Sequence, residues 1–487
     1  MAAPDSTTRR GFFSAGAAAA LTLGNAESLA AADRPNVLVL VVDTLRADHV
    51  YGDRARTPTM EALMRRGLRF TRHHPEAMPT VPFRNSLLTG RRTWPWRGWH
   101  DWPGLLDSPG WQPIEGVGQS LLPVLRRAGY WTGYVTDNPF VGFARPYRGF
   151  RGRVDRFAAH GGQLGGSGRG VSDRELYHWL HPALHADAKI RTRVRKFLAN
   201  ADGYWRDESR SFAARVYRSG VEALNIAATQ RPFALVVDTF EPHEPWTPPR
   251  KYINLYGDPD YRGREPGMPR YGRIDYYVRG AEQRRLLERM QALYAAEVTM
   301  TDRWMGVLLD RLHALSLERE TIVVLVSDHG FFLGEHGWTG KISVALHPAL
   351  IRTPLVIVHP DGRRSGDATD YPAQSHDIAP TILSMAGVRA PRAMNGIDLS
   401  RMFRGRRPPD RFAYGGYSNT LYAYDGRWKL IAGNRGDDRR LYDTKRDPGE
   451  GNNLARRHPR KAAAMFDAVV RRAGGRAPYY VTERSRR

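Results

Sequence analysis

The stretch NVLVLVV at Asn36–Val42 decides the fold class of this chain, because its six apolar residues run directly into Asp43. A second apolar run, TIVVLV at residues 321–326, leads in the same way through one serine to Asp328. Short, continuous apolar runs are typical of central strands in a parallel sheet, which are buried on both faces. The sequence therefore predicts two buried strands, each with an aspartate at its carboxyl end.

Outward from these runs, strand and helix patterns alternate along the chain. Apolar segments that predict further strands lie at residues 130–136, 233–237 and 355–358. Patterns that predict helices lie at residues 57–67, 82–89, 120–128 and 281–315. Strands that alternate with helices indicate an α/β fold, in which helices cover both faces of a parallel sheet.

Two regions depart from this alternation. Residues 95–118 and 145–215 are rich in Trp, Gly, Pro and Arg. We expect them to be long insertions over the edge of the sheet. Loops of such length are usually lids or binding surfaces.

The pattern changes again after about residue 400. Short alternating segments separated by turn residues lie at residues 412–417, 421–424 and 428–431, before a helical pattern at residues 457–473. They predict a small antiparallel sheet followed by a helix. We therefore divide the chain after its first 32 residues into a large domain at residues 33–400 and a C-terminal α+β subdomain at residues 401–487.

The composition of the 487-residue chain excludes several kinds of chemistry. Cysteine is absent, which excludes disulfides, thiolate metal sites, cysteine nucleophiles and any cofactor made by oxidising a cysteine. The net charge of +24 attracts anionic substrates, polyanions or membrane surfaces. Since no zinc-finger, basic-zipper or RNP-type pattern accompanies this charge, we expect no nucleic-acid partner.

Residues 1–32 have the pattern of a signal peptide. Arg9 and Arg10 precede Gly-Phe-Phe, an alanine-rich apolar run follows, and residues 30–32 offer an A-x-A-like cleavage region. The arginine pair resembles a twin-arginine signal, which implies export from a bacterial cytoplasm by the twin-arginine translocase, to the periplasm or beyond. The alternative is an ordinary basic terminus. The apolar run is too short to span a bilayer, so we expect no stable membrane insertion.

Asp43 and Asp328 are the first candidate site residues. Ligands bind at the carboxyl edge of an open parallel sheet, where both aspartates are expected. Two carboxylates at one edge repel each other unless a cation lies between them. His329 adds an imidazole nitrogen, and the three side chains together predict a site for a divalent cation. The alternative is that both aspartates are only turn residues at strand ends.

Eight motifs give these residues a specific context. In chain order they are VVDTLRADH, TPTMEAL, GLRF, TVPFRNSLLTGR, PHEPWTPP, SDHGFFLGEHGWTGK, IRTPLVI and LYDTKRDPGEGNNLA, between about residues 35 and 455. This series resembles the sulfatase family of the alkaline-phosphatase-like superfamily. The resemblance implies a large mixed, mainly parallel sheet flanked by helices, with a smaller C-terminal antiparallel sheet plus helix. It also implies a metal-dependent hydrolase of sulfate or phosphate-type esters.

The family's nucleophile stands first in a motif that is TVPFR here, at residues 80–84. True sulfatases have Cys or Ser at that position and oxidise it to formylglycine. Threonine cannot give that aldehyde, so we expect no formylglycine, and the resemblance implies that Thr80 attacks directly. A metal and a nearby cation would lower the pKa of its hydroxyl. Pro82 marks a helix start, which puts Thr80 near a positive helix end. Arg84 is expected to hold the alkoxide or a substrate oxygen.

The resemblance implies further site residues. Lys341 matches an anion-binding lysine, and His243 matches a histidine that contacts the ester or protonates the leaving group. Thr136, Asn138 and His336 are candidate substrate-binding residues. The alternative for His243 and for each of these three is a structural role, and the alternative for Lys341 is a generic surface cation.

The resemblance also bears on the metal. It favours one divalent cation, Ca²⁺ first, with Mg²⁺ or Mn²⁺ as alternatives that suit the same oxygen-rich ligands. A second zinc cluster would need Asp238, His376 and Asp377, whose spacing is not convincing.

Three functions follow from these residues. The first is a sulfatase-like hydrolase that uses Thr80. The second is a catalytically impaired protein of the same fold that binds anionic glycans, for which the tryptophans between residues 94 and 111 would contact sugars. The third is a phosphotransferase. A substrate in each case is an anionic small-molecule or glycan ester.

The signal can be tested by replacing Arg9 and Arg10 with lysine. We expect the precursor to remain in the cytoplasm, because the translocase recognises the arginine pair and not the charge alone. Fractionation followed by immunoblotting measures the outcome, with wild type as the reference. Unchanged export of the double-lysine variant would refute the twin-arginine hypothesis.

Overall fold

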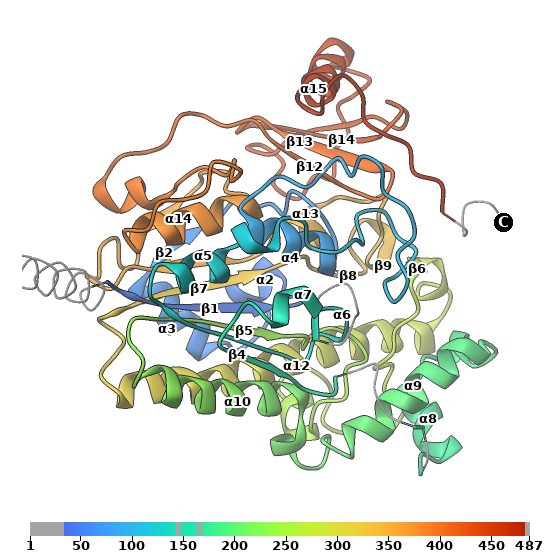
Figure 1. The fold of residues 1–487 in the computed structure, drawn as a ribbon. Coiled ribbons are helices and arrows are strands. Elements are labelled where there is room, and N and C mark those ends of the chain that lie inside the picture. The colour runs from blue at the N-terminus through green and yellow to red at the C-terminus, as the bar shows by residue number, and fades with distance from the viewer. Residues whose placement is uncertain (1–33, 143–147, 163–166, 169, 483–487) are drawn as a thin grey trace, which may run out of the picture.

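The computed structural model describes residues 34–142, 148–162, 167–168 and 170–482. The segment predicted as a signal peptide, residues 1–32, lies outside these described residues. An eight-stranded sheet runs through the large domain between two layers of helices, and a small sheet with one helix lies above it in Figure 1.

The large sheet has the strand order β11-β2-β10-β7-β1-β5-β3-β4. Strand β10 is antiparallel to both of its neighbours, and all other neighbouring pairs are parallel. The expected mixed, mainly parallel sheet is therefore confirmed. Its strands are β1 (Asn36–Val42), β2 (Leu68–Phe70), β3 (Trp131–Thr136), β4 (Arg156–Ala159), β5 (Phe233–Thr239), β7 (Thr321–Ser327), β10 (Leu355–Val358) and β11 (Ala368–Thr369).

Helices cover both faces of this sheet. The α-helices are α2 (Ala47–Val50), α3 (Pro58–Arg66), α4 (Thr80–Thr89), α5 (Leu121–Arg127), α6 (Pro139–Gly142), α7 (Arg148–Arg151), α8 (Asp173–Trp179), α9 (Ala188–Ala201), α10 (Phe212–Ala227), α11 (Arg250–Ile253), α12 (Ala281–Ala314), α13 (Pro348–Ile351), α14 (Ile378–Met385) and α15 (Pro459–Arg472). The 3₁₀ helices are η1 (Val117–Gln119), η3 (Pro182–Leu184), η4 (Glu208–Arg210), η5 (Ile274–Tyr276), η6 (Glu335–Gly337), η7 (Ser375–Asp377) and η8 (Ser400–Arg404).

The central strand β1 explains why the sequence run is apolar throughout. All of its residues are buried, because alternate side chains enter two different cores. Leu38, Leu40 and Val42 pack into the core under α10 and α12. The intervening valines pack into the core under α4, α5 and α14, on the opposite face (Figure 1).

The region at residues 145–215 differs from the expected loop. Its described part contains α7, α8 and α9, and β4 extends the sheet at one edge. Three of its arginines, Arg191, Arg193 and Arg195, lie on α9, whose apolar side chains Val194 and Phe197 reach the main core. Residues 95–118, in contrast, contain only η1 as regular structure.

The C-terminal sheet has four antiparallel strands in sequence order, one more than the sequence predicted. They are β12 (Ala413–Tyr417), β13 (Thr420–Tyr424), β14 (Trp428–Gly433) and β15 (Arg440–Asp443). Helix α15 packs against this sheet. A further small sheet consists of β6 (Gly272–Arg273), β9 (Trp338–Gly340) and β8 (Phe332–Leu333).

Two tryptophans join the C-terminal subdomain to the rest of the protein. Trp94 and Trp96 are buried and contact Tyr414 and Tyr480 edge-on or tilted. Both side chains therefore pack inside the protein and are not exposed for the sugar contact considered from the sequence.

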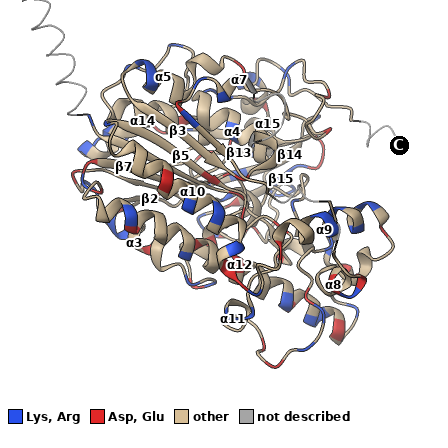
Figure 2. Cartoon of the chain, turned by 60° about the horizontal axis from the view of Figure 1, so that its bottom comes forward, with Lys and Arg blue, Asp and Glu red and all other residues tan. Residues whose placement is uncertain are grey.

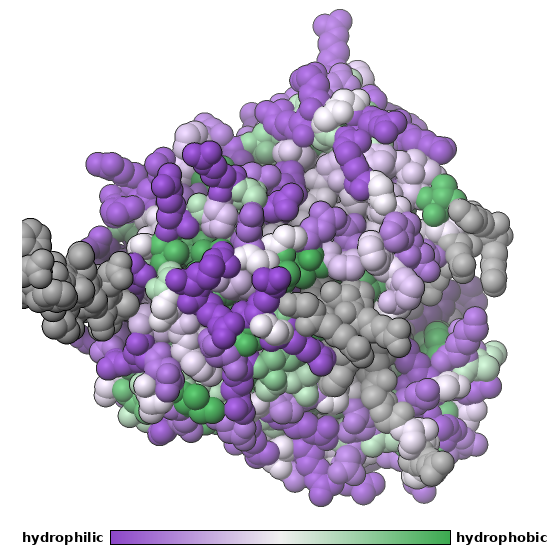
Figure 3. Space-filling model, in the orientation of Figure 1, coloured by the Kyte–Doolittle hydropathy of each residue, from purple (hydrophilic) through white to green (hydrophobic). Residues whose placement is uncertain are grey.

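The outer surface is mostly hydrophilic on the face seen in Figure 3, with hydrophobic residues in small scattered groups. Over the described ranges, no helix combines the length and the apolar character that a membrane crossing requires.

Asp302 joins helix α12 to helix α3, and its substitution tests this contact. Its carboxylate accepts hydrogen bonds from the backbone N–H groups of Thr59 (3.0 Å) and Met60 (2.8 Å) in the first turn of α3. Asp302→Ala would leave both groups without this partner, so we expect a loss of about 1–3 kcal/mol in the free energy of unfolding, measured by urea denaturation. The matched control is Asp310→Ala, an exposed residue of the same helix. Equal stability of the two variants would contradict the proposed role.

Candidate active site

Three aspartates meet at the carboxyl edge of the central strands. The register pairs Val42 of β1 with Ser327 of β7, so that the next residues, Asp43 and Asp328, lie side by side. On the other side of β1, Asp238 of β5 pairs with Val41. All three carboxylates are fully buried. The adjacency of the first two was expected from the sequence, and the third was not assigned to their cluster.

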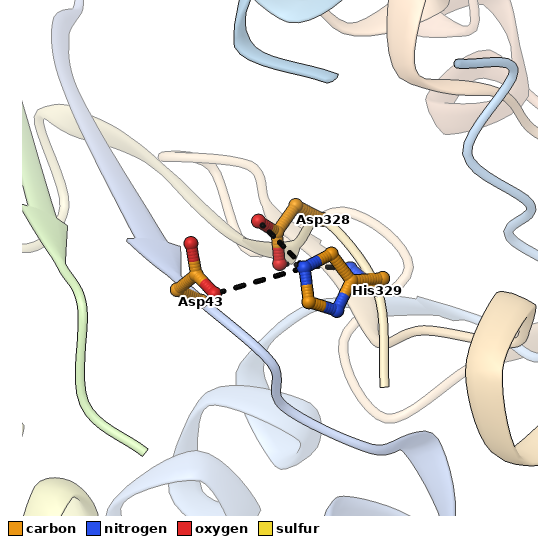
Figure 4. Close-up of side chains that lie close together, drawn as sticks. All are labelled: Asp43, Asp328 and His329. Atoms are coloured by element: carbon orange, nitrogen blue, oxygen red, sulfur yellow. Dashed lines mark hydrogen bonds and ion pairs between the residues drawn. The ribbon is translucent and has the colours of Figure 1, made fainter. Parts of the chain in front are cut away.

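His329 completes the predicted cluster, as Figure 4 shows. Its Nε2 lies 3.8 Å from Oδ1 of Asp43 and 3.6 Å from Oδ2 of Asp328. Its Nδ1 lies 2.9 Å from the carbonyl oxygen of Gly330, which can only accept a hydrogen bond. Nδ1 therefore carries the proton, and Nε2 turns its lone pair toward the two carboxylates.

This arrangement fits a divalent cation. Oδ2 of Asp43 and Nε2 of His329 are buried and have no hydrogen-bond partner within the described part of the chain. Burial and the neighbouring Asp328 raise the pKa of Asp43, and burial lowers the pKa of His329. A lone pair that faces carboxylate oxygens is repelled unless a positive ion lies between them. The donor set of two carboxylates and one imidazole suits Ca²⁺, Mg²⁺ or Mn²⁺.

The guanidinium of Arg84 contacts all three aspartates. Its Nε and Nη2 donate to the carboxylate of Asp238 at 2.9 and 2.6 Å. Its Nη1 donates to Oδ2 of Asp328 (2.9 Å) and to the carbonyl of Thr80 (3.1 Å), and lies 3.2 Å from Oδ2 of Asp43. We expected this guanidinium to hold an alkoxide or a substrate oxygen. It is fully buried and bound to carboxylates instead, so it orients the ligand set.

Thr80 is the first residue of α4. The helix begins two residues before Pro82, where the sequence pattern placed its start, and the predicted position of Thr80 at the helix end is confirmed. Its side chain lines a cavity, and its hydroxyl makes no hydrogen bond to any described residue. The N-terminal end of a helix carries partial positive charge, which favours a developing alkoxide there.

Lys341 and His243 lie in contact at the same cavity. Nζ of Lys341 is 2.8 Å from Nε2 of His243 and 2.9 Å from both carboxylate oxygens of Glu244. The hydroxyl of Tyr271 also donates to Glu244. Neither Glu244 nor Tyr271 was predicted from the sequence. The position of Glu244 beside His243 was a signal, whereas nothing in the sequence marked Tyr271.

His243 is the hydrogen-bond acceptor in its contact with Lys341. Nδ1 of His243 donates to the carbonyl oxygen of Glu244 at 2.7 Å, so its Nε2 accepts from the ammonium of Lys341. Burial lowers the pKa of His243 to about 3, with Lys341 acting in the same direction. Burial alone would raise the pKa of Glu244, but His243 and Lys341 hold it at about 2. At neutral pH the imidazole is therefore uncharged.

The cavity above Thr80 has a volume of about 520 Å³. Thr80, His243 and Lys341 line it together with Arg193 of α9 and Tyr417 of the C-terminal sheet. This is a size typical of small-molecule sites. Three segments that are distant in the sequence therefore enclose one site.

The three candidate substrate-binding residues lie outside this lining. Oγ1 of Thr136 accepts from the backbone of Asn138, and Oδ1 of Asn138 accepts from the backbone of Phe140 at the start of α6. His336 stacks on His347 with 3.7 Å between ring centroids. These contacts match the structural alternative for each residue.

The weak candidates for a second metal cluster are also separated. Asp238 binds Arg84 and Tyr134. Asp377 caps the turn before α14 by accepting from the backbone of Gln374. Among the described residues, the one group with metal-ligand spacing is Asp43, Asp328 and His329.

Comparison with known proteins identifies the family of this chain. The family model "Sulfatase" matches residues 35–388, and a second model, "N-sulphoglucosamine sulphohydrolase, C-terminal", matches residues 334–467. The first match covers well over half of the chain. The chain therefore belongs to the sulfatase family, and it is an ester hydrolase.

Curated relatives cover most of the chain. A choline-sulfatase of Rhizobium meliloti (strain 1021) is 26% identical over 87% of this chain and 82% of its own length. An arylsulfatase of Clostridium perfringens (strain 13 / Type A) is 23% identical over 86% of this chain and 90% of its own length. The multifunctional alkaline phosphatase superfamily protein PehA of Trinickia caryophylli is 26% identical over 77% and 78%.

Solved structures share the fold. The phosphonate monoester hydrolase of Agrobacterium radiobacter superposes with a TM-score of 0.66 at 18% identity, over 91% of this chain and 96% of its own. A protein solved with its substrate D-glucosamine-2-N,6-O-disulfate gives a TM-score of 0.65 at 19% identity, over 91% of this chain and 98% of its own. These likenesses confirm the alkaline-phosphatase-like architecture that the sequence resemblance implied.

The metal site predicts a loss of binding in Asp43→Asn and Asp328→Asn, because each removes one anionic ligand. Metal content measured by plasma mass spectrometry should fall well below one equivalent. The rise in melting temperature on adding metal should also shrink, since a ligand at a hundredfold excess over its Kd stabilises by about 2.7 kcal/mol. Asp310→Asn is the control. A full equivalent of metal in both site variants would place the metal elsewhere.

Proposed function

We propose that this protein hydrolyses sulfate or phosphate-type esters by direct attack of the Thr80 hydroxyl at sulfur or phosphorus. The observation that carries the proposal is the position of Thr80. The residue stands at a helix N-terminus and lines the cavity that Lys341 and His243 also line, and its hydroxyl is without a hydrogen bond to the described residues. Through Arg84, the same helix is tied to the carboxylates of the predicted metal site.

We further propose that activity requires one divalent cation at Asp43, Asp328 and His329, with Ca²⁺ as the first candidate. A bound cation supplies positive charge that favours the ionised Thr80 hydroxyl and the charged oxygens of the ester. Arg84 keeps the two carboxylates in place for it. Its bidentate contact with Asp238 fixes the orientation of its guanidinium plane.

The proposed reaction has two steps. In the first, Oγ of Thr80 bonds to phosphorus or sulfur while the bond to the leaving oxygen breaks. Lys341 donates a proton to that oxygen and regains one, through water, from the Thr80 hydroxyl. In the second, water attacks the phosphorus or sulfur, and the oxygen of Thr80 leaves and takes up a proton from that water. His243 accepts a hydrogen bond from Lys341 throughout and holds the ammonium toward the cavity.

We propose that phosphate-type esters are cleaved better than sulfate esters. A phosphorylated threonine can be hydrolysed at phosphorus, whereas a sulfated threonine lacks the aldehyde hydrate through which formylglycine expels sulfate. Similar proteins named for each kind of ester support a site that accepts both sulfate and phosphate-type esters. Among them are a choline-sulfatase and phosphonate monoester hydrolases. An N-acetylglucosamine-6-O-sulfatase and an ulvan-active sulfatase among the relatives support anionic glycans as substrates.

We also propose that the protein acts outside the bacterial cytoplasm. The support is the twin-arginine pattern of residues 1–32.

Substitution of Thr80 tests the nucleophile. Thr80→Ala should fold, bind metal and lose activity by about 10³-fold or more, because the attacking oxygen is gone. Thr80→Ser keeps a hydroxyl and should retain part of the activity. Chromogenic phosphate monoesters, phosphodiesters, phosphonate esters and sulfate esters are compared with added metals.

Thr89→Ala is the matched control, since this threonine lies at the other end of α4 and bonds within the helix. Two results would contradict the proposal. One is full activity in Thr80→Ala. The other is multiple-turnover release of sulfate without any phosphoesterase activity.

A further inference from the structure

Helix α9 carries an unusual concentration of positive charge beside the active-site cavity. Its sequence, AKIRTRVRKFLANA, holds five cationic residues and no acidic one. Its apolar side chains, Val194, Phe197 and Leu198, are buried in the main core, which fixes how the helix is turned. Figure 2 shows the basic residues of α9 in blue at the edge of the molecule.

Two of the five cationic side chains form hydrogen bonds within the protein. Arg191 donates to the carbonyl oxygen of His185, and Arg195 bonds to Asp173 and to the carbonyl of Val171. These contacts indicate a structural role for the two arginines.

The other three form a stripe, Lys189, Arg193 and Lys196. They are spaced at i, i+4 and i+7 and therefore lie along one face of the helix. All three are exposed, and none of their side chains makes a hydrogen bond or ion pair with any residue in the part of the chain that the structure describes. At 1.5 Å of rise per residue, the stripe is about 10 Å long.

Arg193 connects this stripe to the site, because it lines the cavity above Thr80. Among the described lining residues, the other cation is Lys341, whose charge is balanced by Glu244 at 2.9 Å. Arg193, unlike Lys341, therefore forms no ion pair with a carboxylate of the described residues. A cavity of about 520 Å³ encloses the reacting unit of a substrate, and a longer substrate has to continue outward past its wall.

We propose that Lys189, Arg193 and Lys196 extend the substrate site and bind successive anionic groups of a glycan chain that bears sulfate or carboxylate. The inference rests on the proposed function, in which anionic glycan esters are substrates. Arginine and lysine bind such groups through charge-assisted hydrogen bonds, and the stripe crosses more than one sugar unit. Arg193 holds the anionic group closest to the reacting ester, and the two lysines hold its neighbours along the chain.

The test is direct binding of a fluorescein-labelled short dextran sulfate to the full metal-loaded chain, followed by anisotropy. The variant is the triple substitution Lys189→Ala, Arg193→Ala and Lys196→Ala. We expect its Kd to rise about tenfold over wild type, as three exposed charge contacts add up to roughly that factor. The difference should narrow in high salt, which screens exposed charges.

The matched control removes the same charge elsewhere. Arg456, Arg457 and Arg460 are exposed residues at and before the start of α15, on the opposite side of the molecule in Figure 1, and are replaced together by alanine. We expect the Kd of this triple variant to stay within about twofold of wild type. An equal loss in both triple variants would show that only net charge matters and would overturn the proposal.

A second readout separates the inference from the proposed function. Unlabelled dextran sulfate should raise the KM for a chromogenic ester without changing kcat, since it enters the same cavity. If no ester is turned over, the proposed function fails while the binding comparison still stands. The inference is overturned if the inhibitor lowers kcat alone, or if a DNA duplex depends on the three residues as strongly as dextran sulfate does.

Discussion

The buried contact between Arg84 and three aspartates is the constraint on which the site depends. The guanidinium and all three carboxylates are fully excluded from water. Buried charges are costly unless each is paired and hydrogen-bonded. Asp238 takes two of the guanidinium's bonds, so Asp43 and Asp328 share what remains and are not neutralised by it. The surplus negative charge is what makes a divalent cation beside His329 chemically reasonable.

The same contact links the fold to the chemistry. Asp43, Asp238 and Asp328 lie at or just beyond the carboxyl ends of three adjacent parallel strands, which carry them to one edge of the sheet. Arg84 comes from α4, one helical turn after Thr80, and its Nη1 also binds the Thr80 carbonyl. The position of the candidate nucleophile is therefore set by the group that also binds the carboxylates of the candidate metal site. In the same cavity, His243 and Glu244 accept hydrogen bonds from the ammonium of Lys341.

Much of this could be predicted from the sequence. The apolar runs before Asp43 and Asp328 determined the central strands, and their shared edge placed the two aspartates and His329 together. The start of α4 near Thr80 followed from Pro82 within about a turn. What could not be predicted depends on contacts between distant segments. No local pattern shows that Arg84 binds Asp238, that Tyr271 donates to Glu244, or that Arg193 of α9 lines the cavity.

The central claim is that Thr80 forms a covalent bond to the substrate, and acid-quench mass spectrometry tests it most directly. The metal-loaded protein is mixed with a chromogenic phosphodiester or phosphonate ester, quenched in acid within the first turnovers, digested and sequenced by tandem mass spectrometry. The account predicts a phosphoryl or phosphonyl adduct on the peptide that contains Thr80, localised to that residue, and its absence in Thr80→Ala. Turnover with an unmodified Thr80 at every quench time, or an adduct on another residue, would contradict it.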